Sequence, residues 1–226
     1  MPAHHAFWPK RLPYQLTAPQ TSLWMNLQIS ALRFPQKEAL VFMGRTWTYE
    51  QLLRDTETIA SALRQMGVQK GDRVVLDMQN CPQLVITHFA ILRLDAVVVP
   101  VNPMNRMEEL KHYILDPDAK VAVTTADLAL ELAAASNALE PGLRLQHLLV
   151  TQFTDAFDPA ALQPEDMPAA WRDWLTKIHA LPALEGGQVH AWSEALKTPI
   201  QLDAVSAQPS DLAEIGRASC RERVSS

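Results

Sequence analysis

The stretch KGDRVVLDMQNCPQLVITHFAILRLDAVVVPVNP, residues 70–103, contains the pattern that decides the fold. Two short apolar runs, 73–78 and 96–101, have the length and the β-branched content of strands. Between them, residues 82–93 carry apolar side chains around nearly the whole circumference of a helix, which predicts a helix buried on several sides. A strand, a helix and a second strand in this order predict two parallel strands joined by a crossover.

The same alternation continues after this stretch. Four further elements are expected: strands at 120–124 and 147–151, and helices at 105–115 and 127–139. Asn105, with Glu108 three residues later, is placed to cap the first of these helices, as Asn80 is for the helix at 82–93. Apolar strands that alternate with helices predict an α/β fold, a mostly parallel sheet with flanking helices.

The clearest helix is expected just before this pattern, between Thr48 and Gly67. Thr48 can cap its start, and Gln51 stands three residues later, which is the spacing of a capping box. Gly67 supplies a C-terminal stop. Farther upstream, residues 39–48 indicate a small hairpin with Gly44 in its turn.

The composition is that of an ordinary globular protein. A chain of 226 residues and 25.2 kDa makes one large domain or two small ones. Its net charge of −5 provides no basic field for nucleic acid or an anionic membrane, and two cysteines are too few for a disulfide framework. Charged residues interrupt the most apolar segment, 84–101, and the N-terminus lacks an unbroken apolar stretch. We therefore expect a soluble, cytoplasmic protein with neither a membrane span nor a signal peptide.

Changes in pattern divide the chain into four parts. Residues 1–20 contain four prolines and indicate an extended arm. Residues 21–151, which begin with an expected helix at 23–34, form an N-terminal α/β subdomain. Residues 152–215 form an irregular spacer in which prolines recur and one helix, around 169–178, is expected.

The last part, GRASCRERVSS at 216–226, carries three arginines, one glutamate and a single large apolar residue, Val224. A solvated basic tail is one interpretation. The other is that these residues are a non-native tail, because IGRASCRERV resembles the translation of a widely used sequencing-library adapter. On that interpretation, the fold argument stops at about Ile215.

Glycine is scarce, with seven residues in the chain. No two of them form a G-x-G pair, and none precedes a lysine. A loop that cradles phosphate needs glycines so that backbone N–H groups can approach the phosphate oxygens closely. These 226 residues therefore contain no such loop.

Motifs within residues 38–125 resemble the N-terminal part of the adenylate-forming (AMP-binding) superfamily, which includes acyl-CoA synthetases, adenylation domains of peptide synthetases and luciferases. In order, they are WTYEQL at 47–52, GVQKGDRV at 67–74, NCP and FAILR within 80–93, and AVVVPVNP at 96–103. Each motif is weakly specific, but the order and spacing are those of the family. Asp95 departs from the family pattern, which usually has glycine there, although aspartate tolerates a left-handed backbone better than most residues.

The resemblance implies a two-step ligation that uses ATP, Mg²⁺ and CoA. A carboxylate and ATP give an acyl-adenylate, and the CoA thiol then displaces AMP. The spacer, with Trp171, Trp174 and Trp192, and the FWPKRLP arm at 7–13 are similar to those of bacterial medium- or long-chain fatty acyl-CoA synthetases. In relatives, a strand similar to DLAEI at 211–215 runs directly into the phosphate loop, so we expect a truncated fragment that is inactive as given.

The groups that bind ATP and metal in relatives follow that junction, so we nominate no catalytic, cofactor-binding or metal-binding residue in this chain. Two alternatives stay open. One is another adenylate-forming branch, either an aryl-acid ligase or a peptide-synthetase adenylation domain. The other is a stand-alone, non-catalytic α/β binding module. Acyl chain length, thiol acceptor and oligomeric state are left open.

Other reactive side chains receive structural interpretations. Cys81 is either a thiol with a lowered pKa at a helix N-terminus or, as we expect, a small buried residue. His88 is expected to be a hydrogen-bonded core histidine. No H-x-x-x-H or Cys–His spacing occurs, so no metal site is expected. The remaining candidates are expected in turns, caps or solvated surface: Asp116, Asp118, Glu108 and Glu109, with His4–His5 near the N-terminus.

Overall fold

The computed structural model of this chain describes residues 7, 9, 11–13, 19–162 and 167–216. Most of the arm expected at 1–20, the His4–His5 pair and the tail after Gly216, including its adapter-like sequence, lie outside the described residues.

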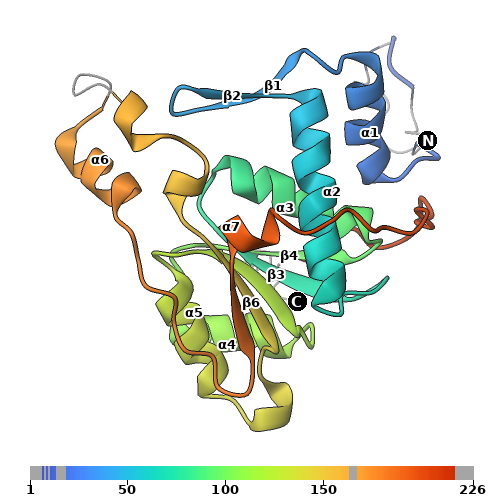
Figure 1. The fold of residues 1–226 in the computed structure, drawn as a ribbon. Coiled ribbons are helices and arrows are strands. Elements are labelled where there is room, and N and C mark those ends of the chain that lie inside the picture. The colour runs from blue at the N-terminus through green and yellow to red at the C-terminus, as the bar shows by residue number, and fades with distance from the viewer. Residues whose placement is uncertain (1–6, 8, 10, 14–18, 163–166, 217–226) are drawn as a thin grey trace.

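Within the described residues, five parallel strands form one sheet in the order β4-β3-β5-β6-β7 (Figure 1). The strands are β3 (Arg73–Asp77), β4 (Val97–Val101), β5 (Val121–Thr125), β6 (His147–Thr151) and β7 (Gln188–Ala191). The predicted α/β fold with a mostly parallel sheet is confirmed. The expected strands lie within one residue of their predicted ends, and β7 was not predicted.

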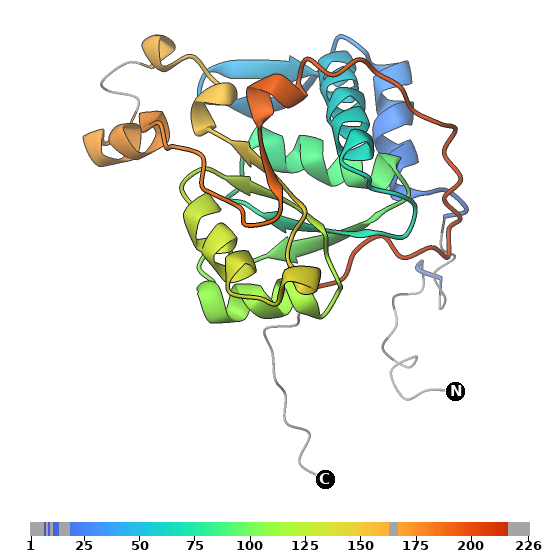
Figure 2. The ribbon, with the colours of Figure 1, turned by 60° about the horizontal axis from the view of Figure 1, so that its bottom comes forward.

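Helices cover both faces of this sheet (Figures 1 and 2). One face carries α1 (Leu23–Arg33), α2 (Tyr49–Gln65), α3 (Pro82–Arg93) and α7 (Trp192–Ala195). The other face carries α4 (Met107–Leu115) and α5 (Ala129–Asn137). The remaining helix of the described chain, α6 (Ala169–Thr176), stands at the periphery of the molecule.

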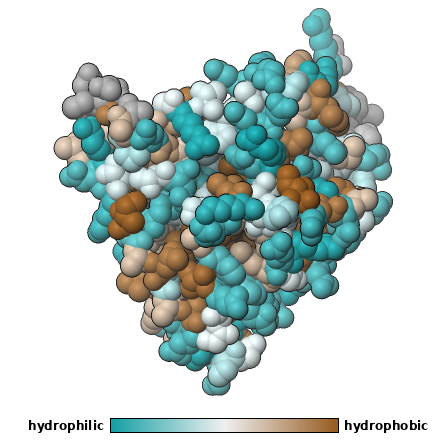
Figure 3. Space-filling model, in the orientation of Figure 1, coloured by the Kyte–Doolittle hydropathy of each residue, from teal (hydrophilic) through white to brown (hydrophobic). Residues whose placement is uncertain are grey.

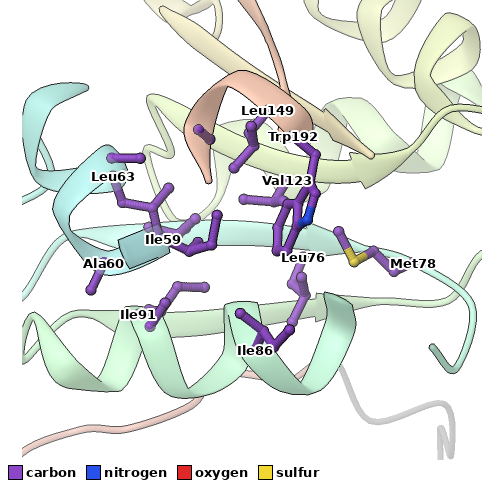
Figure 4. Packing of buried hydrophobic residues seen from close by; sticks show 14 of the residues in the cluster. Ile59, Ala60, Leu63, Leu76, Met78, Ile86, Ile91, Val123, Leu149 and Trp192 are labelled. Carbon is purple, nitrogen blue, oxygen red and sulfur yellow. The ribbon is translucent and has the colours of Figure 1, made fainter. Parts of the chain in front are cut away.

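The core is split by the sheet into two apolar layers. Along β3, Val74 and Leu76 contribute to the layer under α2 and α3, whereas Val75 contributes to the layer under α4 and α5. Figure 4 shows the first layer, in which Trp192 of α7 lies among the side chains of the sheet. Burial on both sides is why these strands are apolar along their whole length rather than at alternate positions.

The predicted hairpin is confirmed as β1 (Glu38–Phe42) and β2 (Arg45–Thr48), which pair antiparallel. Met43 and Gly44 form its two-residue turn, with φ of 45° and 77°. A turn with positive φ at both central residues twists in the same sense as the strands it joins, and glycine adopts that conformation without strain.

The predicted capping of α2 is also confirmed. The backbone N–H of Gln51 donates to Thr48 Oγ1 at 3.3 Å, and the backbone N–H of Thr48 donates to Gln51 Oε1 at 2.9 Å. At the other end, Gly67 has a φ of 91°, the left-handed conformation of a helix stop.

The start of α3 corrects one prediction. Cys81, not Asn80, is the N-cap residue. Pro82 is the first helical residue, where its missing N–H costs nothing, so the cap must be the residue directly before it.

The start of α4 corrects a second prediction. The helix begins at Met107, and Glu109 accepts a hydrogen bond from the backbone N–H of Arg106 at 2.8 Å. The predicted pair of Asn105 and Glu108 does not cap it. Asn105 instead donates its backbone N–H to the carbonyl of Asn102 at 2.9 Å, which makes a separate turn before the helix.

Other helices are shorter than expected. The helix predicted at 127–139 is α5 at Ala129–Asn137, and the one predicted around 169–178 is α6 at Ala169–Thr176. Single turns of 3₁₀ helix add structure that was not predicted, at Pro141–Leu143, Phe153–Asp155 and Pro159–Ala161.

After β6, the chain leaves the sheet and returns to it. A Cβ atom on Gly187 would lie 2.8 Å from the carbonyl oxygen of Gln146, so glycine lets β7 begin close to the start of β6. Residues 197–216 then run back to β4, where Val98 donates its N–H to Ala213 O and Ile215 donates its N–H to Val98 O, both at 2.9 Å. This short parallel pairing extends the β4 edge.

Candidate functional site at the carboxyl end of the sheet

The strand order creates a switch point between β3 and β5. From β3 the chain crosses to β4 on one side, and from β4 it returns to β5 on the other side of β3. In open α/β sheets, ligands bind at the carboxyl ends of the strands at such a point, because the two connections leave in opposite directions. The residues that end β3, β5 and β6 are therefore the first candidates for a site.

Asp77, the last residue of β3, is the most unusual of them. It is 2% exposed, and its Oδ1 has no hydrogen-bond partner among the described residues. Burial, and to a lesser extent the negative charge of Asp127, raises the pKa of this carboxyl to about 7. Asp77 can therefore take up or release a proton near neutral pH, which an ordinary aspartate does not do.

A hydrogen-bonded network ties the end of β6 to the start of α3. Gln83 donates its amide to Thr151 Oγ1 at 3.1 Å and to Gln152 O at 3.0 Å. Asp155 Oδ2 accepts from the Thr151 hydroxyl at 3.1 Å and from the Gln152 backbone N–H at 2.8 Å. Burial raises the pKa of Asp155. The network therefore fixes the side chain of Gln83 next to the carboxyl ends of the strands.

Several polar atoms of this region remain unpaired. Each of the following is buried and has no hydrogen-bond partner among the described residues: Asp77 Oδ1, Gln83 Oε1, Thr87 Oγ1, Thr125 Oγ1 and Asp127 Oδ1. Buried polar atoms are normally paired, because an unpaired one costs about 1–3 kcal/mol. Other such atoms, among them Thr56 Oγ1 and Asp95 Oδ1, lie elsewhere in the described residues, so it is the switch point together with the unpaired atoms on β3, α3 and after β5 that marks this end of the sheet as the candidate site.

The segment around α6 contacts the same end of the sheet. Trp174 donates its indole N–H to Asp127 Oδ2 at 3.3 Å, and its ring lies 4.7 Å from the ring of Phe153. Gln152 exchanges hydrogen bonds with the backbone of His179, at 2.8 and 3.2 Å. The second carboxyl of the site is thus held by a residue far along the chain.

The site does not fit a nucleotide phosphate. Among its charged groups, the buried Asp77 and the half-buried Asp155 are carboxyls, which repel phosphate oxygens, and the nearby Arg45 is exposed and donates to the Asp155 carbonyl at 3.3 Å. The N-terminus of α3 is occupied by the buried Cys81 and Pro82. The glycines with positive φ among the described residues lie in separate turns, at Gly44, Gly67, Gly71 and Gly186. What the arrangement can do is hold a proton on a buried carboxyl beside unpaired hydroxyl and amide groups.

The interpretation of Cys81 as a small buried residue is confirmed. It is 6% exposed, and burial raises the pKa of its thiol to about 11, so the alternative of a reactive thiol is wrong. His88 is half-buried and stands edge-on to Phe89 at 5.5 Å, and burial lowers its pKa. The hydrogen bond predicted for its ring is not formed within the described part of the chain.

The two turn aspartates are placed as expected, whereas the roles expected for Glu108 and Glu109 are exchanged. Asp118 has a φ of 51° in the turn after α4, and Asp116 is the C-cap of that helix. Glu109 caps the start of α4, while Glu108 is exposed and pairs with Lys111 at 2.7 Å. Among residues 7, 9, 11–13, 19–162 and 167–216, no cluster of three or more His, Cys, Asp or Glu is arranged to hold a metal ion.

Sequence reasoning missed the polar cluster altogether. Asp77 and Asp127 were not singled out, although Asp77 lies at the end of the apolar strand pattern at 73–78 and Asp127 lies three residues after the one at 120–124. That position was the available signal, since parallel strands bring their carboxyl ends to one edge.

None of the helices in the described ranges combines the length and the apolar character that crossing a bilayer requires.

Comparison with known proteins gives matches over most of the chain. The family described as AMP-binding enzyme matches residues 27–215. A long-chain-fatty-acid–CoA ligase of Bacillus subtilis is 37% identical over 119 residues, which cover 53% of this chain and 21% of the relative. The long-chain-fatty-acid–CoA ligase of Yersinia pestis is 31% identical over 159 residues, covering 68% of this chain and 28% of the relative. The matched part of the chain therefore spans 21–28% of the length of these relatives.

Solved structures support the fold. Coronafacic acid ligase from Pectobacterium brasiliense superposes with a TM-score of 0.66 at 20% identity, over 87% of this chain and 33% of that chain. MbtA from Mycobacterium smegmatis superposes with a TM-score of 0.62 at 23% identity, over 88% of this chain and 31% of that chain. At such identities the likeness concerns the fold alone.

Proposed function

Because this chain belongs to the AMP-binding enzyme family, we propose that its residues form the N-terminal part of a fatty acyl-CoA ligase. The observation that supports the proposal most is the 37% identity to a long-chain-fatty-acid–CoA ligase over 119 residues. In the proposed reaction, a fatty carboxylate attacks the α-phosphorus of ATP and displaces pyrophosphate. The sulfur of CoA then attacks the acyl carbonyl carbon and displaces AMP.

We assign a scaffolding role in that reaction to these residues. The chain contains no glycine-rich loop, and the carboxyl end of the sheet carries buried carboxyls rather than cations. ATP, Mg²⁺ and CoA would be held by parts of a family enzyme that these 226 residues do not include, and the chain by itself would be inactive. On the same proposal, residues 21–151 form an N-terminal subdomain, and residues 152–215 form a spacer that leads to the phosphate loop.

Two assays test the proposal. The 226-residue chain is assayed for palmitate-dependent exchange of pyrophosphate into ATP, and no exchange above a blank without protein is expected. The gene is also sequenced past codon 215 in genomic DNA, and its complete product is assayed for CoA thioesters of palmitate, octanoate and benzoate.

Thioesters of palmitate or octanoate, but not of benzoate, would support the fatty acyl assignment. Thioester formation with benzoate alone would move the chain to the aryl-acid branch. A complete product that activates no carboxylate would overturn the proposal, and exchange by the 226-residue chain itself would overturn its inactivity.

A further inference from the structure

Two histidines from neighbouring strands meet on one face of the sheet. His147 begins β6, and His190 lies on the edge strand β7. In the parallel register, His147 stands opposite Gln188 and Leu149 stands opposite His190, so both rings project from the same face. His147 Nδ1 lies 3.0 Å from His190 Nε2.

The pair lines a hollow that solvent can enter. The hollow measures about 420 Å³ and is bounded by the C-terminal end of α2, by β7 and by α7. Both histidines are half-buried. Burial lowers the pKa of both imidazoles, and the neighbouring His190 lowers that of His147 further. Both rings are therefore neutral at neutral pH, with lone pairs available to a ligand.

The distance between the two nitrogens matches that of two ligands on one metal ion. Metal–imidazole bonds measure about 2.0–2.1 Å, so two nitrogens on one ion are separated by about 2.9 Å at the 90° angle of an octahedral ion and by about 3.3–3.4 Å at the tetrahedral angle of zinc, and the observed 3.0 Å lies between these values. As a hydrogen bond, the same contact uses one donor and one acceptor nitrogen. Metal binding would need both as acceptors, and the donor ring achieves this by moving its proton to its other nitrogen, without net proton release.

We propose that His147 and His190 form a binding site for one divalent transition-metal ion, with Zn²⁺ or Ni²⁺ as suitable ions. Imidazole nitrogen is a preferred ligand of both. Glu194 lines the same hollow, but its carboxylate accepts a hydrogen bond from Lys197 at 2.6 Å. The described residues offer no third His, Cys, Asp or Glu in place, so water completes the coordination and the ion exchanges readily. The site does not depend on the proposed ligase function.

The test is calorimetric titration of the whole chain with ZnCl₂ in a buffer that does not chelate metals. All proteins carry the background substitutions His4→Gln and His5→Gln, because adjacent histidines near a terminus can bind metal by themselves. We expect one Zn²⁺ per chain. His147→Gln and His190→Gln should each weaken binding at least tenfold, whereas His112→Gln, which replaces an exposed histidine on α4, should leave binding unchanged.

A second variant keeps the test informative if glutamine disturbs the fold. His190→Cys replaces the imidazole with another zinc ligand and should retain most of the affinity. Circular dichroism of each variant reports whether it is folded. Absence of Zn²⁺ binding in the background protein, or equal affinity in folded His190→Gln, would overturn the proposal.

Discussion

Aspartates occur at the carboxyl end of the sheet and at its β4 edge, and their surroundings differ in the two regions. At the β4 edge, Asp211 pairs with Lys70 at 2.9 Å, and the Gln208 backbone N–H together with Lys70 lowers the pKa of Asp211. Asp95 Oδ2 accepts hydrogen bonds from the backbone and hydroxyl of Ser206, at 2.7 and 2.8 Å. At the carboxyl end, Asp77 forms no ion pair with any residue of the described ranges, and burial raises its pKa.

The aspartates at the β4 edge have a structural role, whereas the buried Asp77 is a candidate functional group. The residues at the β4 edge attach the segment 197–216 to the sheet, and exposed ion pairs and hydrogen bonds suffice for that. A buried, unpaired carboxyl lowers stability, and such groups concentrate at functional sites. The two regions therefore respond differently to substitution and to pH.

Asp77→Asn should have the largest effect. The raised pKa means that the folded state holds a proton between about pH 4 and 7 that the unfolded state has lost, so stability falls as pH rises through this range. Asparagine mimics the protonated acid. The variant should be more stable at pH 8 by up to about 4 kcal/mol, at about 1.4 kcal/mol for each pKa unit. Urea unfolding of both proteins at pH 5 and pH 8 measures this. If the free energy of unfolding changed between the two pH values by the same amount in the variant as in the unsubstituted protein, the prediction would be contradicted.

A pair of threonines compares bonded and unbonded hydroxyls within the site. Thr151→Val removes a hydroxyl that contacts Gln83 and Asp155, and should cost about 2 kcal/mol because each partner loses one of its two hydrogen bonds in the network. Thr125→Val removes a buried hydroxyl that has no partner among the described residues, and should be neutral or stabilising by about 1 kcal/mol. Chemical denaturation compares the two variants, and equal losses would show that the Thr125 hydroxyl is also bonded.

Asp95 tests the β4 edge. It has a φ of 56°, which confirms the left-handed backbone considered for this position. Asp95→Ala loses the bonds to Ser206 and keeps the strained backbone, so it should cost about 1–2 kcal/mol. Asp95→Gly loses the same bonds but relieves the backbone, and should cost about 1 kcal/mol less than alanine. A urea unfolding midpoint that is lower for Asp95→Gly than for Asp95→Ala would contradict this account.

Lys70→Gln should have the smallest effect. The ion pair with Asp211 is solvent-exposed, and such pairs contribute little to stability. We expect no measurable change in melting temperature at 1 M NaCl and at most a slight decrease at low salt. A large decrease that persists in high salt would show that the β4 edge depends on this pair more than its exposure suggests.

Local predictions succeeded where the forces involved act over a few residues. The Thr48–Gln51 capping box, the Met43–Gly44 turn and the stop at Gly67 each depend on hydrogen bonds or dihedral angles within one short segment. The two capping errors were also local, because each cap lies one residue after the predicted one. Pro82 places the cap of α3 at Cys81 instead of Asn80, and the turn from Asn102 to Asn105 places the cap of α4 at Arg106.

By itself, the sequence determined that apolar strands alternate with helices, and therefore that a parallel sheet buried on both faces would form. Only the tertiary structure decided the strand order, the addition of β7, and the meetings of Asp77 with Asp127 and of His147 with His190. The physical reason is the distance along the chain over which each property is determined. Periodicity records which face of an element is buried, whereas the choice of neighbour depends on how crossovers pack, and no short segment encodes that choice.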